Sequence, residues 1–542
     1  MVFSNSNATV SASIQTLLKN PQTWIKSLTP TQSLFVGLGA IFLVSFLANA
    51  IVSRYRSGKL PPGPRRLPLI ENLLDMPTEQ EWLTWAEWGR RYGPISSATV
   101  FGQHMIIVNS SEIAANMFAK KSSIYSDRPL LTMFGDLCGY GRFLSFLPYG
   151  SLWRRRRTLI QKTIGTAASS AKFSMVEEKE AHLLLKRMRK DPDGLLDHIR
   201  MAAGSIILDI SYGYQTQESK DPLVDLAETV MDGFGITLRP GAYLVDTLPI
   251  LKYVPYWFPG AKFKRQAKHW RSLLQRFVEE PYATVKSNMK SGRFRHSFTS
   301  SLVEGSSLNP EEENDIKWSS AMLFAGGADT TVASLYGLIL ALVLNPEAQT
   351  RAQAEIDEVI GRDRLPSLRD RENLLYLNAL VTEAIRWHSV APFNFRRVME
   401  DDVQNGYLIP KNSTIVINQW QLLHDPEVYP EPMKFDPMRF LPREGYTLPP
   451  DPRLYAFGTG KRICPGRYLA EASVFIATAM ILSVFRIEKK VGDNGEVIEP
   501  IVHPMTGATC HMAPYECAIK PRDARAEILI AGEVNMGKDG IE

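Results

Sequence analysis

The chain has 542 residues, with 44% hydrophobic and 22% charged side chains and a formal net charge of +5. The basic residues are scattered and lack interleaved aromatic residues, so the composition gives little support to nucleic-acid binding. The four cysteines, Cys138, Cys464, Cys510 and Cys517, are too sparse and unpatterned for a disulfide framework or a zinc site, which favours a cytosolic redox environment.

Residues 33–52 are 20 residues without a charged side chain. A helix of this length, at about 1.5 Å per residue, spans the roughly 30 Å hydrocarbon layer of a bilayer, so we predict one N-terminal transmembrane helix. Some thirty residues precede it, which argues against a cleaved signal peptide. Two basic residues precede the span and five follow it, which places residues 1–32 in the lumen and the remainder in the cytosol. Asn7-Ala8-Thr9 would then be a luminal glycosylation sequon.

Residues 53–68 contain those five basic residues and four prolines. Proline lacks an N–H donor and pushes the preceding residue toward extended geometry, so the membrane helix cannot continue through this stretch. We therefore predict a stiff, basic, proline-rich linker.

Trp153 is followed by four consecutive arginines, Arg154 to Arg157, on a predicted helix that begins after Gly150. Trp153 and Arg157 are four residues apart and share one face of that helix, whereas Arg154–Arg156 point elsewhere. A solvated basic face is the ordinary interpretation of such a run. The alternative is that one face binds an anion and the other remains free for a partner.

Residues 243–260 are apolar and aromatic, and three prolines interrupt them. This is poor material for a regular helix, and it suits either a lid over a binding site or a packed loop. If the segment dips into a bilayer beside the anchor, membrane-dissolved molecules would enter directly, because buried apolar area supplies the attraction. We then expect apolar substrates of low charge.

The longest helical signal runs from Pro310 to Leu344, between Asn309-Pro310 and Asn345-Pro346. Its middle reads GGADTT, from Gly326 to Thr331. Each glycine costs a helix about 1 kcal/mol relative to alanine, and an acid in an apolar wall costs more, so either a function or a kink with a capped carboxylate should offset them. Because Asp329 interrupts the apolar run, we predict a core helix rather than a second membrane span.

Further along, Glu383 and Arg386 lie three residues apart on a predicted helix, where the two side chains can pair. Such pairs are common on solvated helices and carry little information alone. About 80 residues later, residues 457–466 read FGTGKRICPG, with Cys464 in a glycine-rich basic loop ahead of a predicted helix over 468–476. The glycines allow a tight turn, and the positive helix end favours a thiolate. A lone axial thiolate is a haem-iron ligand that favours O–O cleavage.

These ten residues fit the pattern F-x-x-G-x-R-x-C-x-G, and the chain from about residue 60 to 520 resembles the cytochrome P-450 superfamily, most closely its fungal microsomal members. The resemblance implies a mostly α (α+β) fold, with a long central helix over haem b and small β-sheets. We expect strands at Met105–Asn109 and Ser413–Trp420. A length prior of about 150 residues per domain suggests three domains, but the absence of internal boundaries favours one haem-thiolate monooxygenase domain over 69–520, with a polar tail at 521–542.

The resemblance also implies roles for individual residues. Thr330 would hydrogen-bond bound oxygen, and Asp329 would help to deliver protons. The expected haem-binding residues are Cys464 as the iron ligand, Trp153, Arg157, Arg397, Arg462, Phe457, Gly458 and Gly466. Glu383, Arg386 and Arg439 would form a buried structural triad. Arg154–Arg156, Lys461 and Arg453 would form a basic patch for an acidic flavin domain.

The predicted function is insertion of one oxygen atom from O₂ into an apolar small molecule, a terpenoid, polyketide or aromatic skeleton of fungal secondary metabolism. Electrons would come from NADPH through NADPH–cytochrome P-450 reductase at the endoplasmic reticulum membrane. The segments expected to line the substrate site are 128–145, 235–260 and 390–397. Two alternatives remain: a reductase-independent haem-thiolate isomerase or coupling enzyme, and a membrane-bound haem sensor or carrier. Neither alternative has an evident use for the intact Asp329-Thr330 pair.

Overall fold

The computed structural model describes residue 29 and residues 60–218, 221–239 and 241–533. The predicted luminal segment with Asn7, the predicted membrane helix at 33–52 and the first part of the linker lie outside these described residues. Pro61–Gln404 and Ile409–Glu542 group into one compact unit, and the remaining residues, Met1–Leu60 and Asn405–Leu408, group separately.

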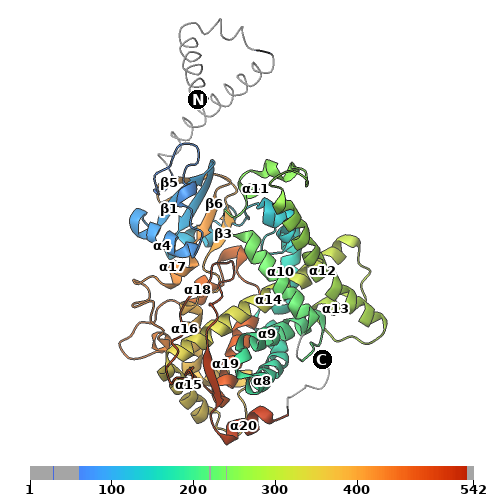
Figure 1. Cartoon of the computed structure of the whole chain (residues 1–542), viewed down its shortest axis with the longest axis vertical. Helices are drawn as coiled ribbons and strands as arrows, with labels where there is room; N and C mark the ends of the chain where they lie inside the picture. Colours follow the sequence, from blue (N-terminus) through green and yellow to red (C-terminus); the bar gives the residue numbers. More distant parts are fainter. Residues whose placement is uncertain (1–28, 30–59, 219–220, 240, 534–542) are drawn as a thin grey trace, which may run out of the picture. The chain divides into compact units, whose positions relative to one another are not determined.

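The described residues are mostly α-helical with small β-sheets, as predicted (Figure 1). The helices are α4 (Glu81–Tyr92), α5 (Ser111–Ala115), α6 (Ser151–Ile164), α7 (Ala167–Ser170), α8 (Ser174–Lys190), α9 (Leu195–Tyr212), α10 (Pro222–Leu238), α11 (Leu244–Thr247), α12 (Lys262–Lys290), α13 (Phe298–Val303), α14 (Pro310–Leu344), α15 (Pro346–Val359), α16 (Leu375–Trp387), α17 (Gln419–Leu423), α18 (Arg453–Ala456), α19 (Arg467–Val484) and α20 (Ala524–Ala531).

Helix α14 has the predicted bounds and runs through the middle of the compact unit, packed against α6, α9 and α19 (Figure 1). It begins at Pro310 because the Asn309 side chain accepts hydrogen bonds from the backbone N–H groups of Glu311 and Glu312. Among the described helices, α14 and α19 are long and apolar enough to cross a membrane, but most of their apolar residues are buried inside the protein. The prediction that α14 is a core helix is therefore confirmed.

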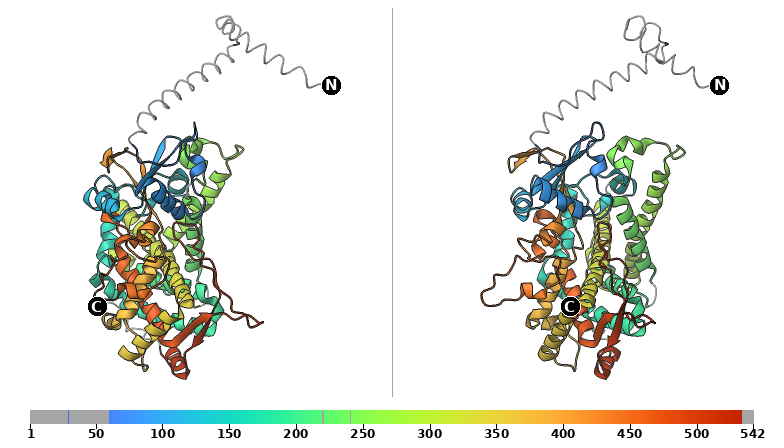
Figure 2. Two further views of the ribbon diagram at one scale, coloured as in Figure 1. Left: turned by 90° about the vertical axis from the view of Figure 1, so that its left-hand side faces the viewer. Right: turned by 60° about the vertical axis from the view of Figure 1, so that its left-hand side comes forward.

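A four-stranded sheet in the order β1-β2-β6-β3 is formed by β1 (Ile95–Val100), β2 (Gln103–Val108), β6 (Thr414–Ile417) and β3 (Asn394–Arg397). β2 and β6 are parallel, and the other neighbouring strands are antiparallel. A second sheet pairs β7 (Phe485–Lys489) with β8 (Cys517–Pro521), and β4 (Asp402–Gln404) and β5 (Tyr407–Ile409) are three residues each. Figures 1 and 2 show β1 and α11 at the same end of the compact unit.

Two sequence expectations differ from the structure at element boundaries. The strand expected to reach Trp420 ends at Ile417, because the Asn418 side chain caps α17 by accepting from the Gln421 N–H. The tail expected from residue 521 contains α20, which Asp523 caps at its N-terminus. Ile530 of α20 is only 2% exposed and packs into the core, so this part of the chain is not a loose tail.

Candidate active site

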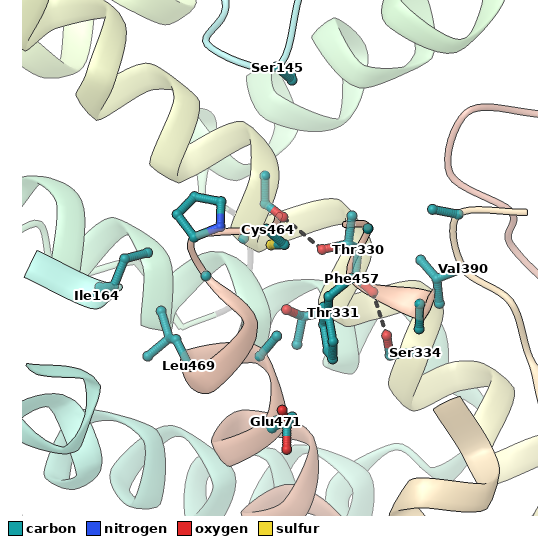
Figure 3. A pocket seen from close by; sticks show the side chains of 18 of the residues that line it. Ser145, Ile164, Thr330, Thr331, Ser334, Val390, Phe457, Cys464, Leu469 and Glu471 are labelled. Atoms are coloured by element: carbon teal, nitrogen blue, oxygen red, sulfur yellow. Dashed lines mark hydrogen bonds between the residues drawn. The ribbon is translucent and has the colours of Figure 1, made fainter. Parts of the chain in front are cut away.

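A cavity of about 350 Å³ lies at the centre of the compact unit, between α14 and the loop that carries Cys464. Its mostly apolar walls come from α6, α9, α14, α16, α19 and the segments around residues 144 and 390. Figure 3 shows Cys464, Phe457 and Thr330 around this cavity. The predicted iron ligand and the predicted oxygen-binding segment therefore face one enclosed space, although 134 residues of sequence separate Thr330 from Cys464.

The loop before α19 is shaped by its glycines. Gly458 and Gly460 have φ angles of +74° and +63°, which L-residues with side chains rarely adopt. A Cβ atom on Gly460 would lie only 1.9 Å from the Phe118 carbonyl oxygen, so no other residue fits there. The Cys464 N–H donates to the Phe457 carbonyl oxygen at 2.8 Å, which closes the turn beneath the thiol.

Burial raises the pKa of the Cys464 thiol, whereas a hydrogen bond from the Gly466 N–H and the nearby charges of Arg157 and Arg467 lower it. The net direction is upward, so burial outweighs the expected effect of the helix terminus and the basic loop. A metal cation bonded to the sulfur would favour the thiolate much more strongly than these groups do.

Five arginines gather around one side of this cavity: Arg128, Arg157 and Arg462 line it, Arg396 is buried beside them, and Arg397 lies next along β3. Arg128 and Arg396 both donate to the Asn394 side-chain oxygen, each at 2.6 Å. Arg462 donates to the carbonyl oxygens of Ser126 and Leu147, each at 2.8 Å. None of Arg128, Arg157, Arg396 and Arg462 has a carboxylate within ion-pair distance among the described residues.

Asp127 acts on Arg128 and Arg462 only through space, so burial is the largest influence on the pKa values of these cations. It lowers the pKa of Arg396 to about 9 and that of Arg462 to about 10. The pKa of Arg128 is also lowered, first by burial and then by repulsion from Arg396 and Arg462, while Asp127 opposes the shift. Arg128 Nε and one Arg396 Nη atom are buried without a hydrogen-bond partner in the described part of the chain. Such a cluster is costly unless an anion binds it.

Arg397 does not occupy the place expected from the sequence. It forms an ion pair with Asp127, with 3.0 Å between Nε and Oδ2, and it does not line the cavity. Arg396 is the buried neighbour that joins Arg128 and Arg462, because successive residues of a strand point to opposite faces. Strand alternation in FNFRR would have distinguished the two arginines, but the sequence contains no comparable signal for Arg128.

Trp153 and Arg157 both line the cavity from α6, as their shared helical face predicts, and the Arg462 guanidinium lies 4.6 Å from the Trp153 ring centroid. The other face of α6, where Arg154–Arg156 were expected to be free for a partner, is partly occupied by contacts within the protein. Arg156 is buried and binds Asp315 at 2.8 Å.

Arg155 binds Asp315 at 2.8 Å and also Glu311. Arg453 binds Asp451 and Glu471. The predicted basic patch is therefore wrong for Arg156, whereas Arg155 and Arg453 stay at the surface with their charges offset by carboxylates. Arg154 and Lys461 remain exposed, both beside the Tyr149 ring.

The central segment of α14 is helical through both glycines, as part of one continuous helix. Gly326, Gly327, Thr330 and Thr331 line the cavity. The Thr330 hydroxyl donates to the Gly326 carbonyl oxygen at 2.7 Å (Figure 3). A Cβ atom on Gly327 would lie 2.7 Å from Cγ1 of Ile207, so close packing with α9 also requires this glycine.

Asp329 points away from the cavity wall that Thr330 forms, since it is not among the lining residues. It accepts a hydrogen bond from His511 Nε2 at 2.8 Å, from a loop 182 residues further along the chain. Burial raises the pKa of Asp329, but His511, Thr509 and Arg200 together lower it, so the carboxylate is the favoured form. His511 has no distinctive sequence context, and we did not expect it at this site.

Glu383, Arg386 and Arg439 meet in a buried cluster. Both Glu383 oxygens accept from Arg386, at 2.7 and 2.8 Å, and Arg439 Nε lies 3.4 Å from Glu383 Oε1. The Arg386 guanidinium also donates to the carbonyl oxygens of Leu423 and Pro432. This paired arrangement ties α16 to the segment that precedes the Cys464 loop.

Comparisons with known proteins agree with this architecture. The Cytochrome P450 family model matches residues 61–513. Cytochrome P450 monooxygenase 208 of Postia placenta is 47% identical over 493 residues, covering 91% of this chain and 96% of that protein. Cytochrome P450 monooxygenase claR of Ampulloclitocybe clavipes is 43% identical, covering 93% and 94%. Cytochrome P450 monooxygenase CLM2 of Gibberella zeae is 42% identical, covering 87% and 91%.

The chain therefore belongs to the cytochrome P450 family and is an oxidoreductase of its fungal monooxygenase class. Family membership implies a haem cofactor. The residues fit such a group, because the cavity offers a cysteine ligand, apolar walls for a flat macrocycle and unneutralised buried arginines for its two carboxylates. When bound, haem supplies the activation of O₂, and the protein supplies binding, orientation and proton control.

Proposed function

We propose that this protein is a membrane-anchored monooxygenase that inserts one oxygen atom from O₂ into an apolar small molecule of fungal secondary metabolism, such as a terpenoid, polyketide or aromatic skeleton. Electrons come from NADPH through NADPH–cytochrome P450 reductase at the endoplasmic reticulum membrane. The observation that carries the proposal is the mostly apolar cavity that extends from Cys464 to the Gly326–Thr331 wall of α14.

In this proposal Cys464 ligates the iron of haem b, and Phe457, Gly458 and Gly466 shape the face beneath it. Trp153, Arg157 and Arg462, together with Arg128 and Arg396, hold the propionates through charge-assisted hydrogen bonds. Arg397 orders this region indirectly, through Asp127. Glu383, Arg386 and Arg439 form the structural triad that supports the Cys464 loop.

Thr330 and Asp329 handle protons on the opposite side of the cavity. The Thr330 hydroxyl reaches the cavity while its proton is directed at the Gly326 carbonyl oxygen, so it can accept a hydrogen bond from a bound molecule. Asp329 is held as a carboxylate by His511 at the outer side of α14. Asp329 would first take up a proton from solvent, and a side-chain rotation toward Thr330 would then carry that proton inward.

The lid at 243–260 supports an apolar substrate class. Its Leu244, Ile250, Tyr253 and Trp257 side chains are mostly exposed, with Trp257 at 80%. Soluble surfaces seldom gather so many large apolar groups, which are typical of membrane-contacting sites. The lid is joined to the predicted lining segment 128–145, because Asp246 accepts from the Met133 N–H at 2.7 Å.

The proposed domain organisation follows from the anchor. Residues 1–32 are luminal, 33–52 span the membrane once, 53–68 form the linker and the monooxygenase domain follows from residue 69 in the cytosol. Deleting residues 1–56 should weaken membrane association while haem incorporation stays intact, as measured by fractionation and the CO-difference spectrum. Loss of haem from the truncated protein would contradict this organisation.

The function itself is tested in membranes that contain the full chain with and without the reductase. Apolar candidate substrates should cause a high-spin spectral shift, and their oxygenated products should form only with reductase and NADPH. Matched carboxylated or phosphorylated derivatives should do neither. Turnover without the reductase would favour an isomerase or coupling enzyme, and haem binding without any turnover would favour a haem sensor or carrier.

A further inference from the structure

A second, much smaller cavity adjoins the active-site cavity. It measures about 20 Å³ and lies between α8, α9, α14 and α19. Four residues line both cavities: Ala203, Ile206, Thr331 and Ser473. A cavity needs roughly 10–15 Å³ to hold one water molecule, so the smaller space is large enough for one.

Glu177 of α8 projects into the smaller cavity and is only 1% exposed. Its Oε1 accepts a hydrogen bond from the Ser473 hydroxyl at 2.6 Å, while Oε2 is buried without a partner in the described part of the chain. No cation lies within ion-pair distance of Glu177 among the described residues. Arg371 and Glu178 act on it only through space, with opposite effects on its pKa.

This environment favours a neutral carboxylic acid. Burial raises the pKa of Glu177 to about 8, and the Ser473 hydrogen bond only partly opposes that rise. Because Ser473 donates to Oε1, the acid proton resides on Oε2, the oxygen without a partner. A buried O–H donor is nearly always satisfied, and a water in the small cavity is the acceptor that the geometry offers.

We propose that this cavity is a water site, and that Glu177, this water, Ser473 and Thr331 form a buried proton store beside the active site. The Glu177 O–H bond breaks as the proton passes to the water. The water then passes a proton through the hydroxyl groups toward the main cavity, leaving Glu177 as a carboxylate. A proton taken up from solvent through the partly exposed Asp329–His511 side returns along the main cavity and the same chain to Glu177 before the next cycle, so the store is refilled and the consumed proton comes from solvent.

The proposed proton store differs from the Asp329–His511 pair in its protonation state, its exposure to solvent and the cavity that it lines. Asp329 is ionised, partly exposed and lines neither cavity. Glu177 is 1% exposed, favours the neutral acid and lines the small cavity together with Thr331. The inference rests on the proposed oxygenase function for its catalytic consequence. The protonation state of Glu177 and its water can be measured without turnover.

The first test is an infrared difference spectrum on photolysis of the CO complex of the full chain, because a change at the iron alters the field at Glu177. We expect a protonated-carboxyl C=O band that shifts in D₂O and disappears in Glu177→Gln. The matched control, Glu178→Gln, should keep it, since Glu178 instead accepts from the Leu368 N–H. Absence of such a band, or its persistence in Glu177→Gln, would overturn the proposal.

Two further measurements use the same proteins. A high-resolution crystal structure of the unmodified chain should contain a water within hydrogen-bond distance of Glu177 Oε2, and a dry cavity would refute the site. In turnover, Glu177→Gln should raise the amount of peroxide released per product about two- to fivefold. The product-forming rate should fall by much less than the roughly 10²–10⁴-fold that loss of a direct general acid would cause. Unchanged coupling and solvent isotope effect would rule out the proton store, and loss of all turnover in the unmodified chain would instead count against the proposed function.

Discussion

Two buried groups of arginines in this protein differ in whether a carboxylate of the chain pairs with them. Arg386 and Arg439 share the Glu383 carboxylate, which offsets part of their charge, and backbone carbonyls accept from the remaining guanidinium N–H groups. Arg128, Arg396 and Arg462 converge on the active-site side and donate to an amide oxygen and carbonyl groups. No described carboxylate lies within ion-pair distance of them, and Asp127, which pairs with Arg397, acts on Arg128 and Arg462 only through space. The first group is complete within the chain, whereas the second requires an external anion.

The difference separates scaffold from binding site without any bound ligand. A buried charge that has lost its partner costs several kcal/mol, so an unneutralised cluster persists only where another molecule completes it. Whether a buried arginine belongs to the scaffold or to a binding site is therefore indicated by its partners rather than by its burial alone. The predictions below test this distinction, beginning with the largest effect.

Arg386→Met should be the most damaging change, because it leaves the Glu383 carboxylate buried without its forked partner. We expect a loss of about 3–5 kcal/mol in the free energy of unfolding and little folded holoprotein. Circular dichroism and urea unfolding would measure it. The control is Arg276→Met, which breaks an exposed pair with Glu280 and should cost under about 1 kcal/mol. Equal stability of the two variants would contradict the scaffold role.

Cys464→His should leave the scaffold intact and change the ligand chemistry. The reduced, CO-bound protein should lose the strongly red-shifted Soret band that a thiolate ligand produces, and oxygenase activity should disappear. Haem should still bind in part, because the arginine cluster is unchanged. An unaltered CO spectrum would show that Cys464 is not the ligand.

Arg396→Met tests the incomplete cluster directly. Removing this cation relieves repulsion with Arg128 and Arg462, so the haem-free protein should be at least as stable as the unmodified one. Haem should nevertheless dissociate about tenfold faster or more, since a hydrogen bond to a charged group contributes about 1.5–3 kcal/mol. Transfer of haem to apomyoglobin measures the rate. Arg397→Met should release haem more slowly than Arg396→Met. The reverse order would indicate that Arg397, rather than Arg396, binds the haem.

Thr330→Ala should affect coupling rather than stability, because among the described residues the Thr330 hydroxyl bonds within its own helix. Haem binding and NADPH consumption should persist while peroxide released per product rises. Thr350→Ala removes the same kind of intrahelical bond in α15 and should change neither quantity. Unaltered coupling in Thr330→Ala would remove Thr330 from the proton path.

The last prediction concerns the pH dependence of the free energy of unfolding. Glu177 lacks the arginines of Glu383, and burial raises its pKa to about 8. Between about pH 4.5 and 8 the folded state therefore binds more protons at this site than the unfolded state, so its contribution to stability is lost as pH rises. Glu177→Gln should flatten this decline in chemical unfolding curves measured across that range. An unchanged slope would indicate that Glu177 is ionised in the folded protein.

Sequence reasoning succeeded where one contiguous segment carries the information. The helix over Pro310–Leu344 contains its own caps and apolar core, and FGTGKRICPG contains its own turn glycines. It failed where the deciding partner is distant along the chain. Asp315, which buries Arg156, lies 159 residues from it, and His511 lies 182 residues from Asp329. Sequence also could not show that α20 packs into the core or that Arg396 rather than Arg397 is enclosed, because both depend on tertiary contacts.

The fit of Gly460 against Phe118, and of Arg462 against Ser126 and Leu147, has a consequence for biosynthesis. The cysteine loop and the segment that holds it are 336 residues apart between Arg462 and Ser126. At roughly 5–20 residues per second, a ribosome needs tens of seconds to make the intervening chain. The metal-binding chamber therefore closes only when translation is nearly finished. Cofactor capture is therefore a late event in the life of the nascent protein, because the cationic wall is itself complete only after Arg462 has been made.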